Sequence, residues 1–188
     1  APRASDPDGD ILSFTLSNTP SWASFSTSTG ELSGPPENGD VGTTNNLLIT
    51  VSDGAASDSI GPFSIVVSNT NDAPIISGVP ATGVAEDSAY SFAPSASDPD
   101  GDNLSFTISN KPSWASFSTS TGELSGAPKN GDVGTTNNIL ITVSDGAATD
   151  SIGPFSITVS NTNDAPTISG VPATRVDEDS AYSFAPGA

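Results

Sequence analysis

The chain contains two copies of one sequence. The segment Ser5–Asp10, which reads Ser-Asp-Pro-Asp-Gly-Asp, returns as Ser97–Asp102, and the first Asp of each copy (98 − 6) gives a period of 92 residues. Substitutions between the copies are few, for example Glu37 against Lys129. A period of this length in 188 residues predicts small domains, each with one modest hydrophobic core.

The period also sets the expected domain boundaries. We expect a first repeat over residues 1–71 that lacks its first strands, followed by a complete second repeat over residues 72–163. Residues 164–188 are expected to carry the first strands of a following repeat. We call these three ranges the first repeat, the second repeat and the tail.

The charge of the chain narrows the possible partners. With 22 acidic and 4 basic residues the net charge is −18 at pH 7. Such a balance disfavours binding to nucleic acid or to an anionic membrane surface, and it favours cations. We therefore expect no nucleic-acid partner and no membrane insertion.

The chain has no Cys and no His. Disulfides, zinc sites of the usual ligand types, thiol nucleophiles and imidazole bases are therefore excluded together. Most familiar hydrolase mechanisms depend on one of these groups, so we expect a protein that is not an enzyme.

Apolar and polar residues alternate along short segments separated by Gly- and Pro-containing turns. Leu104, Phe106 and Ile108, for example, alternate with Ser and Thr. The pattern predicts an all-β sandwich of two antiparallel sheets. The predicted strands of the second repeat are residues 74–79, 84–94, 104–109, 113–119, 122–126, 138–144 and 154–160. The predicted core is Tyr90, Phe92, Leu104, Phe106, Ile108, Trp114, Phe117, Leu124, Ile139, Ile141, Val143, Phe155, Ile157 and Val159.

Five motifs follow one another along the second repeat: Glu86, Asp98-Pro-Asp-Gly-Asp102, Thr121-Gly-Glu-Leu124, Ser144-Asp-Gly146 and Asn161-Thr-Asn-Asp-Ala-Pro166. In this order they resemble a cadherin repeat, most closely the bacterial cadherin-like repeats of the dystroglycan type and the related putative Ig-like tandem repeats of large surface or secreted proteins. The resemblance covers the whole period. It implies tandem seven-stranded Ig-like, cadherin-like β-sandwiches joined end to end, with Ca²⁺ held where one domain meets the next.

The resemblance also implies which residues hold the metal. Calcium prefers oxygen ligands, which Asp, Asn and Glu supply. The opening of the first repeat would offer Asp6, Asp8 and Asp53. The junction between the repeats would use Asp40, Asn69, Asn71, Asp72, Asp98, Asp100 and Asp145, and the following junction Glu86, Asp132, Asn161, Asn163 and Asp164. Because Asn69 and Asn161 stand where cadherins usually carry Asp, we expect fewer ions at each junction than is usual in that family.

Other interpretations of the acidic motif are weaker. It resembles the start of an EF-hand loop, but Ile11 or Asn103 stands where that loop needs Gly, and Ser17 or Ser109 stands where it needs Glu. A plain turn is a real alternative, because Pro and Gly favour one. A glycosidase pair would need one carboxyl in an apolar pocket, whereas these lie together in a charged turn.

The expected function is structural. We expect a calcium-binding repeat of a rigid extracellular rod, serving as a spacer, adhesin or filament segment of a secreted or cell-surface protein that takes part in cell adhesion. The alternative is a carbohydrate-binding module attached to a secreted polysaccharide-active protein. In that alternative Trp22 and Trp114 would lie exposed and stack on sugar rings.

The positions of the repeat boundaries lead to one more expectation about partners. Neighbouring repeats can supply the missing strands, or identical chains can exchange them head to tail. In the second case Val176, Tyr182 and Phe184 of one chain would enter the sandwich of the next at Leu12, Phe14 and Phe63. Glu178 would then join Asp40, Asp72, Asp98 and Asp100 of the receiving chain, so calcium would favour the assembly.

Overall fold

The first repeat forms two small antiparallel sheets in the computed structural model, which describes residues 2–187. One sheet has the order β1-β4-β5, from β1 (Ser13–Ser17), β4 (Gly42–Ser52) and β5 (Ser57–Val67). The other pairs β2 (Ser24–Phe25) with β3 (Leu32–Ser33). A short 3₁₀ turn, η1 (Asn38–Asp40), precedes β4.

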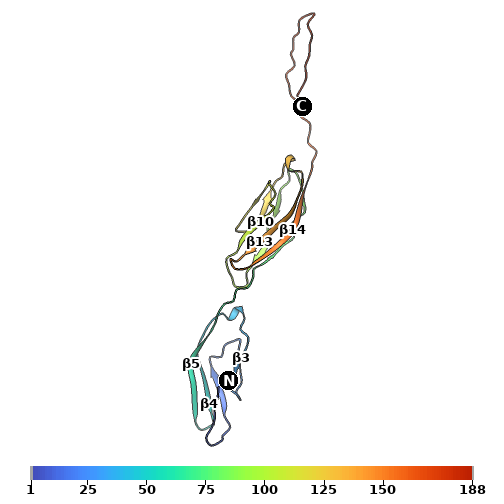
Figure 1. The fold of residues 1–188 in the computed structure, drawn as a ribbon. Coiled ribbons are helices and arrows are strands. Elements are labelled where there is room, and N and C mark those ends of the chain that lie inside the picture. The colour runs from blue at the N-terminus through green and yellow to red at the C-terminus, as the bar shows by residue number, and fades with distance from the viewer. Residues whose placement is uncertain (1, 188) are drawn as a thin grey trace. The chain divides into compact units, whose positions relative to one another are not determined.

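The second repeat contains the same elements and additional strands. A four-stranded sheet has the order β10-β13-β14-β7, from β10 (Ser105–Ser109), β13 (Gly134–Ser144), β14 (Thr149–Ser160) and β7 (Gly83–Ala85). Figure 1 shows β10, β13 and β14 side by side. A three-stranded sheet has the order β11-β12-β8, from β11 (Ala115–Phe117), β12 (Leu124–Gly126) and β8 (Tyr90–Phe92). The last pair joins β6 (Ile75–Ser77) to β9 (Ser95–Ser97), and η2 (Asn130–Asp132) precedes β13.

The two larger sheets of the second repeat pack face to face. The ring of Phe92 on β8 contacts that of Phe155 on β14 at a centroid distance of 6.5 Å. Ile139, Ile141 and Val143 alternate along β13 with exposed or half-buried residues, and their side chains have no accessible surface. This is the arrangement of an all-β, Ig-like sandwich, as the alternation of apolar residues predicts.

Most of the predicted core is buried, and part of it is not. Tyr90, Phe92, Phe106, Leu124, Ile157 and Val159 join the three β13 residues inside the sandwich. Leu104, Ile108, Trp114, Phe117 and Phe155, which the sequence places in the core, are half-buried instead. The first four lie at or next to the ends of β10 and β11, whereas Phe155 lies within β14.

The predicted strand over residues 84–94 is wrong as a single strand. Asp87 has a φ of +61°, which a continuous strand does not allow, so β7 and β8 are separate. Strand β9 was not predicted, and β13 and β14 start earlier than expected, at Gly134 and Thr149.

The early start of β14 has a counterpart in β5 of the first repeat. Leu47 faces Phe63 and Ile49 faces Ile60, so Gly61 and Pro62 form a bulge and do not end the strand. A Cβ atom on Gly61 would lie 2.6 Å from the Leu47 carbonyl oxygen, so the bulge requires glycine. A Gly-Pro pair that looks like a strand boundary in the sequence is therefore inside the strand.

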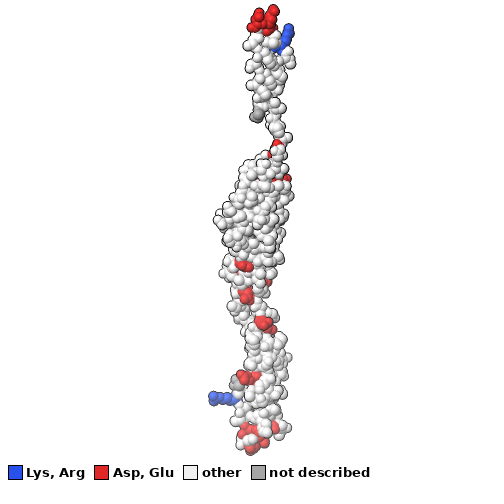
Figure 2. All heavy atoms as spheres, turned by 90° about the vertical axis from the view of Figure 1, so that its right-hand side faces the viewer, with Lys and Arg blue, Asp and Glu red and all other residues white. Residues whose placement is uncertain are grey.

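The chain divides into two compact units that cross the sequence repeats. One unit consists of Ala1–Ile76, Ala96–Ser105 and Val143–Asp150, and the other of Ser77–Ser95, Phe106–Thr142 and Ser151–Ala188. The first unit thus contains the first repeat, the linker around Asn71 and two loops of the second repeat. Figure 2 shows that basic side chains are few on the face drawn and that acidic ones gather in small groups.

Candidate metal centre

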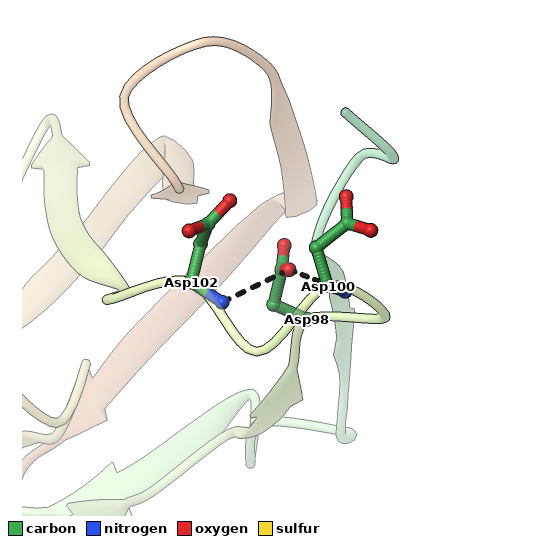
Figure 3. A group of neighbouring side chains, drawn as sticks. All are labelled: Asp98, Asp100 and Asp102. Atoms are coloured by element: carbon green, nitrogen blue, oxygen red, sulfur yellow. Dashed lines mark hydrogen bonds between the residues drawn. The ribbon is translucent and has the colours of Figure 1, made fainter. Parts of the chain in front are cut away.

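The Asp98–Asp102 loop gathers three carboxylates. Oxygen atoms of Asp98, Asp100 and Asp102 lie within 4.8 Å of one another. Asp98 Oδ1 accepts hydrogen bonds from the backbone N–H groups of Asp100 (2.8 Å) and Asp102 (3.2 Å), as Figure 3 shows. Gly101, with a φ of +79°, closes the turn. The loop therefore holds three negative charges at close range by its own backbone.

The linker approaches this loop within the same compact unit. The backbone N–H of Asp72 donates to Asp100 Oδ2 at 2.6 Å. The side-chain amide of Asn38 donates to Asp72 Oδ2 at 2.7 Å. A carboxylate from the linker thus lies next to the three carboxylates of the loop, and Asn38 in η1 orients it.

Asp145, in the turn between β13 and β14, is held by three donors. The N–H groups of Ala147 and Ala148 each lie 2.6 Å from its Oδ1, and the amide of Asn71 lies 3.0 Å from its Oδ2. The N–H of Ala148, together with Asn71 and Ala147, holds the pKa of Asp145 below its usual 3.8. Asp145 is therefore a fixed anion that anchors Asn71 of the linker.

Two oxygens of the loop have no hydrogen-bond partner although they are buried. They are Asp98 Oδ2 and Asp100 Oδ1. A buried acceptor without a partner costs about 1–3 kcal/mol, and more when it is charged. Among residues 2–187 the ion pair is between Lys129 and Asp87, and neither side chain belongs to this cluster. A divalent cation with oxygen ligands fits both unpartnered atoms.

A second group forms around Glu86 in the other unit. Glu86 lies just after β7 and is only 2% exposed. Its Oε1 accepts a hydrogen bond from the backbone N–H of Thr162, whereas its Oε2 is buried without a partner. The amide of Asn130 donates to Asp164, as Asn38 does to Asp72 in the first group. An orphaned carboxylate oxygen therefore lies beside the linker that follows the second repeat.

A match along both repeats shows the family of the chain. The family model described as "Putative Ig domain" matches residues 1–68 and 73–160. The chain belongs to this family.

Solved structures similar to this Putative Ig domain chain include two cadherin fragments. Human protocadherin-24 EC1-2 is 17% identical with a TM-score of 0.48, over 86% of this chain and 86% of that one. Mouse cadherin-23 EC22-24 is 15% identical with a TM-score of 0.48, over 84% of this chain and 56% of that one. An endo-fucoidan hydrolase from glycoside hydrolase family 107 is 26% identical with a TM-score of 0.40, over 83% of this chain but only 24% of the hydrolase.

No curated protein matches the chain at a significant level. Among the described residues, no helix has the length and apolar character needed to cross a membrane. The family membership rests on the match to both Putative Ig domain stretches.

Some residues that the resemblance implied as ligands have other partners in this Putative Ig domain protein. Asp40 accepts hydrogen bonds from the N–H of Glu37 (3.0 Å) and from the hydroxyl of Ser21 (3.2 Å). The bond with Glu37 caps η1. Asp132 caps η2 in the same way, through Lys129 and Ser113. Both carboxylates thus hold a 3₁₀ turn.

The remaining predicted ligands fall into three places. Asp6 and Asp8 form the same internally bonded loop in the first repeat, next to Asp53 with its Ala55 and Ala56 donors. Asn69 and Asn161 are exposed in the linkers, and Asn163 donates to the carbonyl oxygen of Asp164. Glu178 lies exposed in the tail.

Two residues of the central group were not among the predicted ligands. Asp102 completes the three-carboxylate cluster, and Asn38 holds the linker carboxylate. Asp102 is the third Asp of the Asp-Pro-Asp-Gly-Asp run, so the sequence did carry a signal for this residue. The sequence carries no local signal for Asn38, because its partner is 34 residues away.

Trp114 bears on the carbohydrate alternative. Its ring is half-buried and packs edge-to-face against Tyr90 at a centroid distance of 5.7 Å. A sugar platform needs a flat aromatic face open to solvent, whereas this ring supports the interior of the sandwich. The Trp114 ring therefore offers no observation in favour of sugar binding.

Proposed function

We propose that this Putative Ig domain chain is a calcium-binding structural segment of an extracellular protein. Its repeats serve as a stiff spacer that carries other domains of a secreted or surface protein. Domains of this family are typically extracellular and without enzymatic activity. The acidic composition, with a net charge of −18, fits a protein whose ligands are cations.

One observation carries the proposal: Asp98 Oδ2 and Asp100 Oδ1 are buried without partners in a cluster of acidic groups. Left alone, these charges repel one another and lack the hydrogen bonds that burial demands. Calcium relieves both costs, because it neutralises charge and accepts many oxygen ligands in a flexible geometry. Asp98, Asp100 and Asp102 would hold it, together with Asp72 from the linker.

The ion would act by fastening the linker to the loop. Asp72 already donates its N–H to Asp100 Oδ2, and Asn71 donates to Asp145. These hydrogen bonds bring the linker to the cluster, and a shared ion would strengthen that attachment. Without the ion, repulsion among the carboxylates would loosen the linker and expose it to proteases.

Glu86 would contribute to a second ion at the following linker. Its Oε2 is buried without a partner, and Asp164 lies in the adjoining segment. This group holds fewer carboxylates among the described residues than the first. We therefore expect the first site to bind more tightly.

Calcium titration by calorimetry tests the proposal. Asp100→Asn keeps the shape of the side chain but removes a charge from the cluster, so calcium affinity should fall by about tenfold or more. Asp8→Asn is the matched control, because Asp8 holds the same place in the loop of the first repeat. It should leave the tight site unchanged.

The outcomes are distinct. Tight binding that Asp100→Asn weakens and Asp8→Asn does not would support the central site. Magnesium should compete poorly, since it demands a small octahedral shell. A chain that releases no heat with calcium, or that binds it equally well after Asp100→Asn, would show that the cluster is only a turn.

A further inference from the structure

Two asparagine–glycine pairs lie in the short 3₁₀ turns of the repeats. Asn38-Gly39 lies in η1 and Asn130-Gly131 in η2, whereas every other asparagine of the chain precedes a residue with a side chain. Glycine has no Cβ, so its backbone nitrogen is the one that the side-chain carbonyl carbon of a preceding asparagine reaches most easily. These two asparagines are therefore the ones most prone to deamidation.

Both pairs are accessible to water. Asn38, Gly39, Asn130 and Gly131 are all exposed. A Cβ atom on either glycine would meet nothing within 4 Å, and neither glycine has a positive φ. The two turns therefore do not require glycine for their shape, and alanine can replace it without strain.

The side-chain amide of Asn38 ties the linker to η1. Its Nδ2 donates to Asp72 Oδ2 at 2.7 Å, and the backbone N–H of Asp72 donates to Asp100 Oδ2 at 2.6 Å. All three residues belong to one compact unit. A neutral donor thus holds a carboxylate of the linker beside the Asp98–Asp102 loop.

A carboxylate in place of this amide would undo the tie. It cannot donate a hydrogen bond, and it would repel Asp72 at the distance where the amide now attracts it. Glu37 and Asp40 already give η1 two negative charges. Loss of one amide group would therefore change the attachment of the linker from attractive to repulsive.

We propose that Asn38 is a site of spontaneous deamidation, which makes the attachment of the linker depend on calcium. The backbone nitrogen of Gly39 bonds to Cγ of Asn38, and the side-chain nitrogen leaves as ammonia together with the proton from Gly39. The product is a five-membered succinimide ring. Water adds to one of the two ring carbonyl groups and breaks its bond to nitrogen, which yields aspartate or isoaspartate. Overall, one water is consumed and one ammonia is released, without an enzyme or an oxidant.

The hydrogen bond to Asp72 should control the rate. Ring closure needs the Asn38 side chain to turn towards the Gly39 nitrogen, so it competes with that bond. The carbonyl oxygen of Asn38 also accepts the N–H of Val41 at 3.3 Å, which holds the turn closed. Deamidation should therefore proceed in molecules whose linker has left η1, and it should then hinder the return of the linker.

The turn of the second repeat provides a comparison. The amide of Asn130 donates to Asp164 as that of Asn38 does to Asp72. Lys129 precedes Asn130, whereas Glu37 precedes Asn38. A new carboxylate at position 130 would lie next to a cation in the sequence, so it should disturb its linker less.

The modification is tested by peptide mapping with mass spectrometry on the full chain, kept in chelator at warm, mildly alkaline conditions. Asn38 and Asn130 should gain the mass of an amide-to-acid conversion while Asn71 stays intact. Gly39→Ala should abolish the conversion of Asn38 and leave that of Asn130 unchanged. Asp72→Ala should speed the conversion of Asn38 several-fold. An Asn38 that stays intact while a short peptide of the same sequence deamidates would overturn the proposal.

The consequence is tested by hydrogen exchange of the Asp72 amide, followed by NMR in chelator. Asn38→Asp, which copies the aspartate product, should speed this exchange several-fold, because the N–H that donates to Asp100 becomes free more often. Asn38→Ala removes the donor without adding a charge, so it should have a smaller effect. Asn130→Asp is the matched control and should leave the Asp72 amide as protected as before. Equal exchange of Asp72 in Asn38→Asp and in the unchanged chain would overturn the proposal.

A calcium arm separates this inference from the proposed function, on which the following step alone rests. A bound ion would neutralise the repulsion between Asp72 and the new carboxylate, which could supply it with another oxygen ligand. Calcium should therefore restore the protection of the Asp72 amide in Asn38→Asp. Exchange that is fast in Asn38→Asp with or without calcium would keep the deamidation and its effect on the linker, and reject the dependence on calcium.

Discussion

The two repeats have almost the same sequence and differ in how completely their cores are closed. Ile141 and Val143 on β13 are fully buried, whereas their counterparts Ile49 and Val51 on β4 are half-buried and line an open groove of about 380 Å³ in the first repeat. The strands that both repeats share lie at equivalent residues and differ by at most one residue in length. The difference shows that local sequence sets the strands, while residues 75–92 supply the cover that makes a core.

The largest expected effect is the cost of a cavity in the closed core. Ile141→Ala should lower the free energy of unfolding of the second repeat by about 2–5 kcal/mol, because a rigid, fully buried site cannot collapse. Ile49→Ala should cost the first repeat only about 1–2 kcal/mol, since part of that side chain is already in water. Chemical unfolding measures both values.

Each repeat has its own reporter for this comparison. Trp22 and Trp114 are the two tryptophans, so Trp22→Phe or Trp114→Phe leaves the fluorescence of a single repeat. Equal losses in the two repeats would mean that the first core is closed in solution, and the comparison would fail.

The fold could largely be predicted from the sequence because its determinants are local. The alternation of Leu104, Phe106 and Ile108 indicates a strand and its inward face without any tertiary information. The break at Asp87 and the bulge at Gly61 and Pro62 depend on backbone angles that neighbouring strands stabilise. The pattern of apolar residues does not encode these angles, so the single strand over residues 84–94 and the start of the last strand at residue 154 were predicted wrongly.

The candidate site also has a part that the sequence could predict and a part that it could not. The three Asp residues of one turn must lie close together, so their grouping was visible in the sequence. The meeting of Asn38 with Asp72, or of Asn71 with Asp145, depends on loops 34 and 74 residues apart. The resemblance implied Asp40 as a ligand, and its capping bonds to Glu37 and Ser21 appear only once η1 has formed.

Calcium binding should give the next largest effect. It should act on the Asp98–Asp102 loop and not on the equivalent Asp6–Asp10 loop of the first repeat. At a calcium concentration 100 times the Kd, stabilisation amounts to about 2.7 kcal/mol. Calorimetric melting in calcium and in chelator measures the shift. Asp98→Asn should remove the shift, whereas Asp6→Asn, the same position in the first repeat, should keep it. A melting temperature that is independent of calcium would contradict the metal centre.

Removal of the Tyr90 hydroxyl should have a smaller effect, and only on the second repeat. Its hydroxyl donates to the Ala81 carbonyl oxygen at 2.9 Å, and burial raises the pKa of its phenol above 10.0. Because the folded pKa is raised, the associated stability is present below pH 10 and is lost as the pH rises through the folded value. Tyr90→Phe should cost about 0.5–1.5 kcal/mol at neutral pH.

Ultraviolet absorbance in a pH titration measures the ionisation of Tyr90. The variant Tyr182→Phe leaves Tyr90 as the sole tyrosine, so the absorbance change belongs to one group. Ionisation of Tyr90 at or below pH 10 would show that β8 does not cover the core in solution.

The smallest effect concerns the matching loops at Asp53 and Asp145 in the metal-free chain. Hydrogen bonds from the N–H groups of Ala56 and Ala55 hold the pKa of Asp53 below 3.8, and those of Ala148, Asn71 and Ala147 do so for Asp145. A lowered folded pKa contributes stability above pH 3.8 that is lost as the pH falls through the folded value.

Asn71 is the one extra donor, so Asn71→Ala should raise the pKa of Asp145 and leave that of Asp53 unchanged. Carboxyl ¹³C shifts followed by NMR from pH 6 to pH 2 measure both groups. A pKa of Asp145 that does not respond to Asn71→Ala would mean that the linker is detached from the loop before any ion binds.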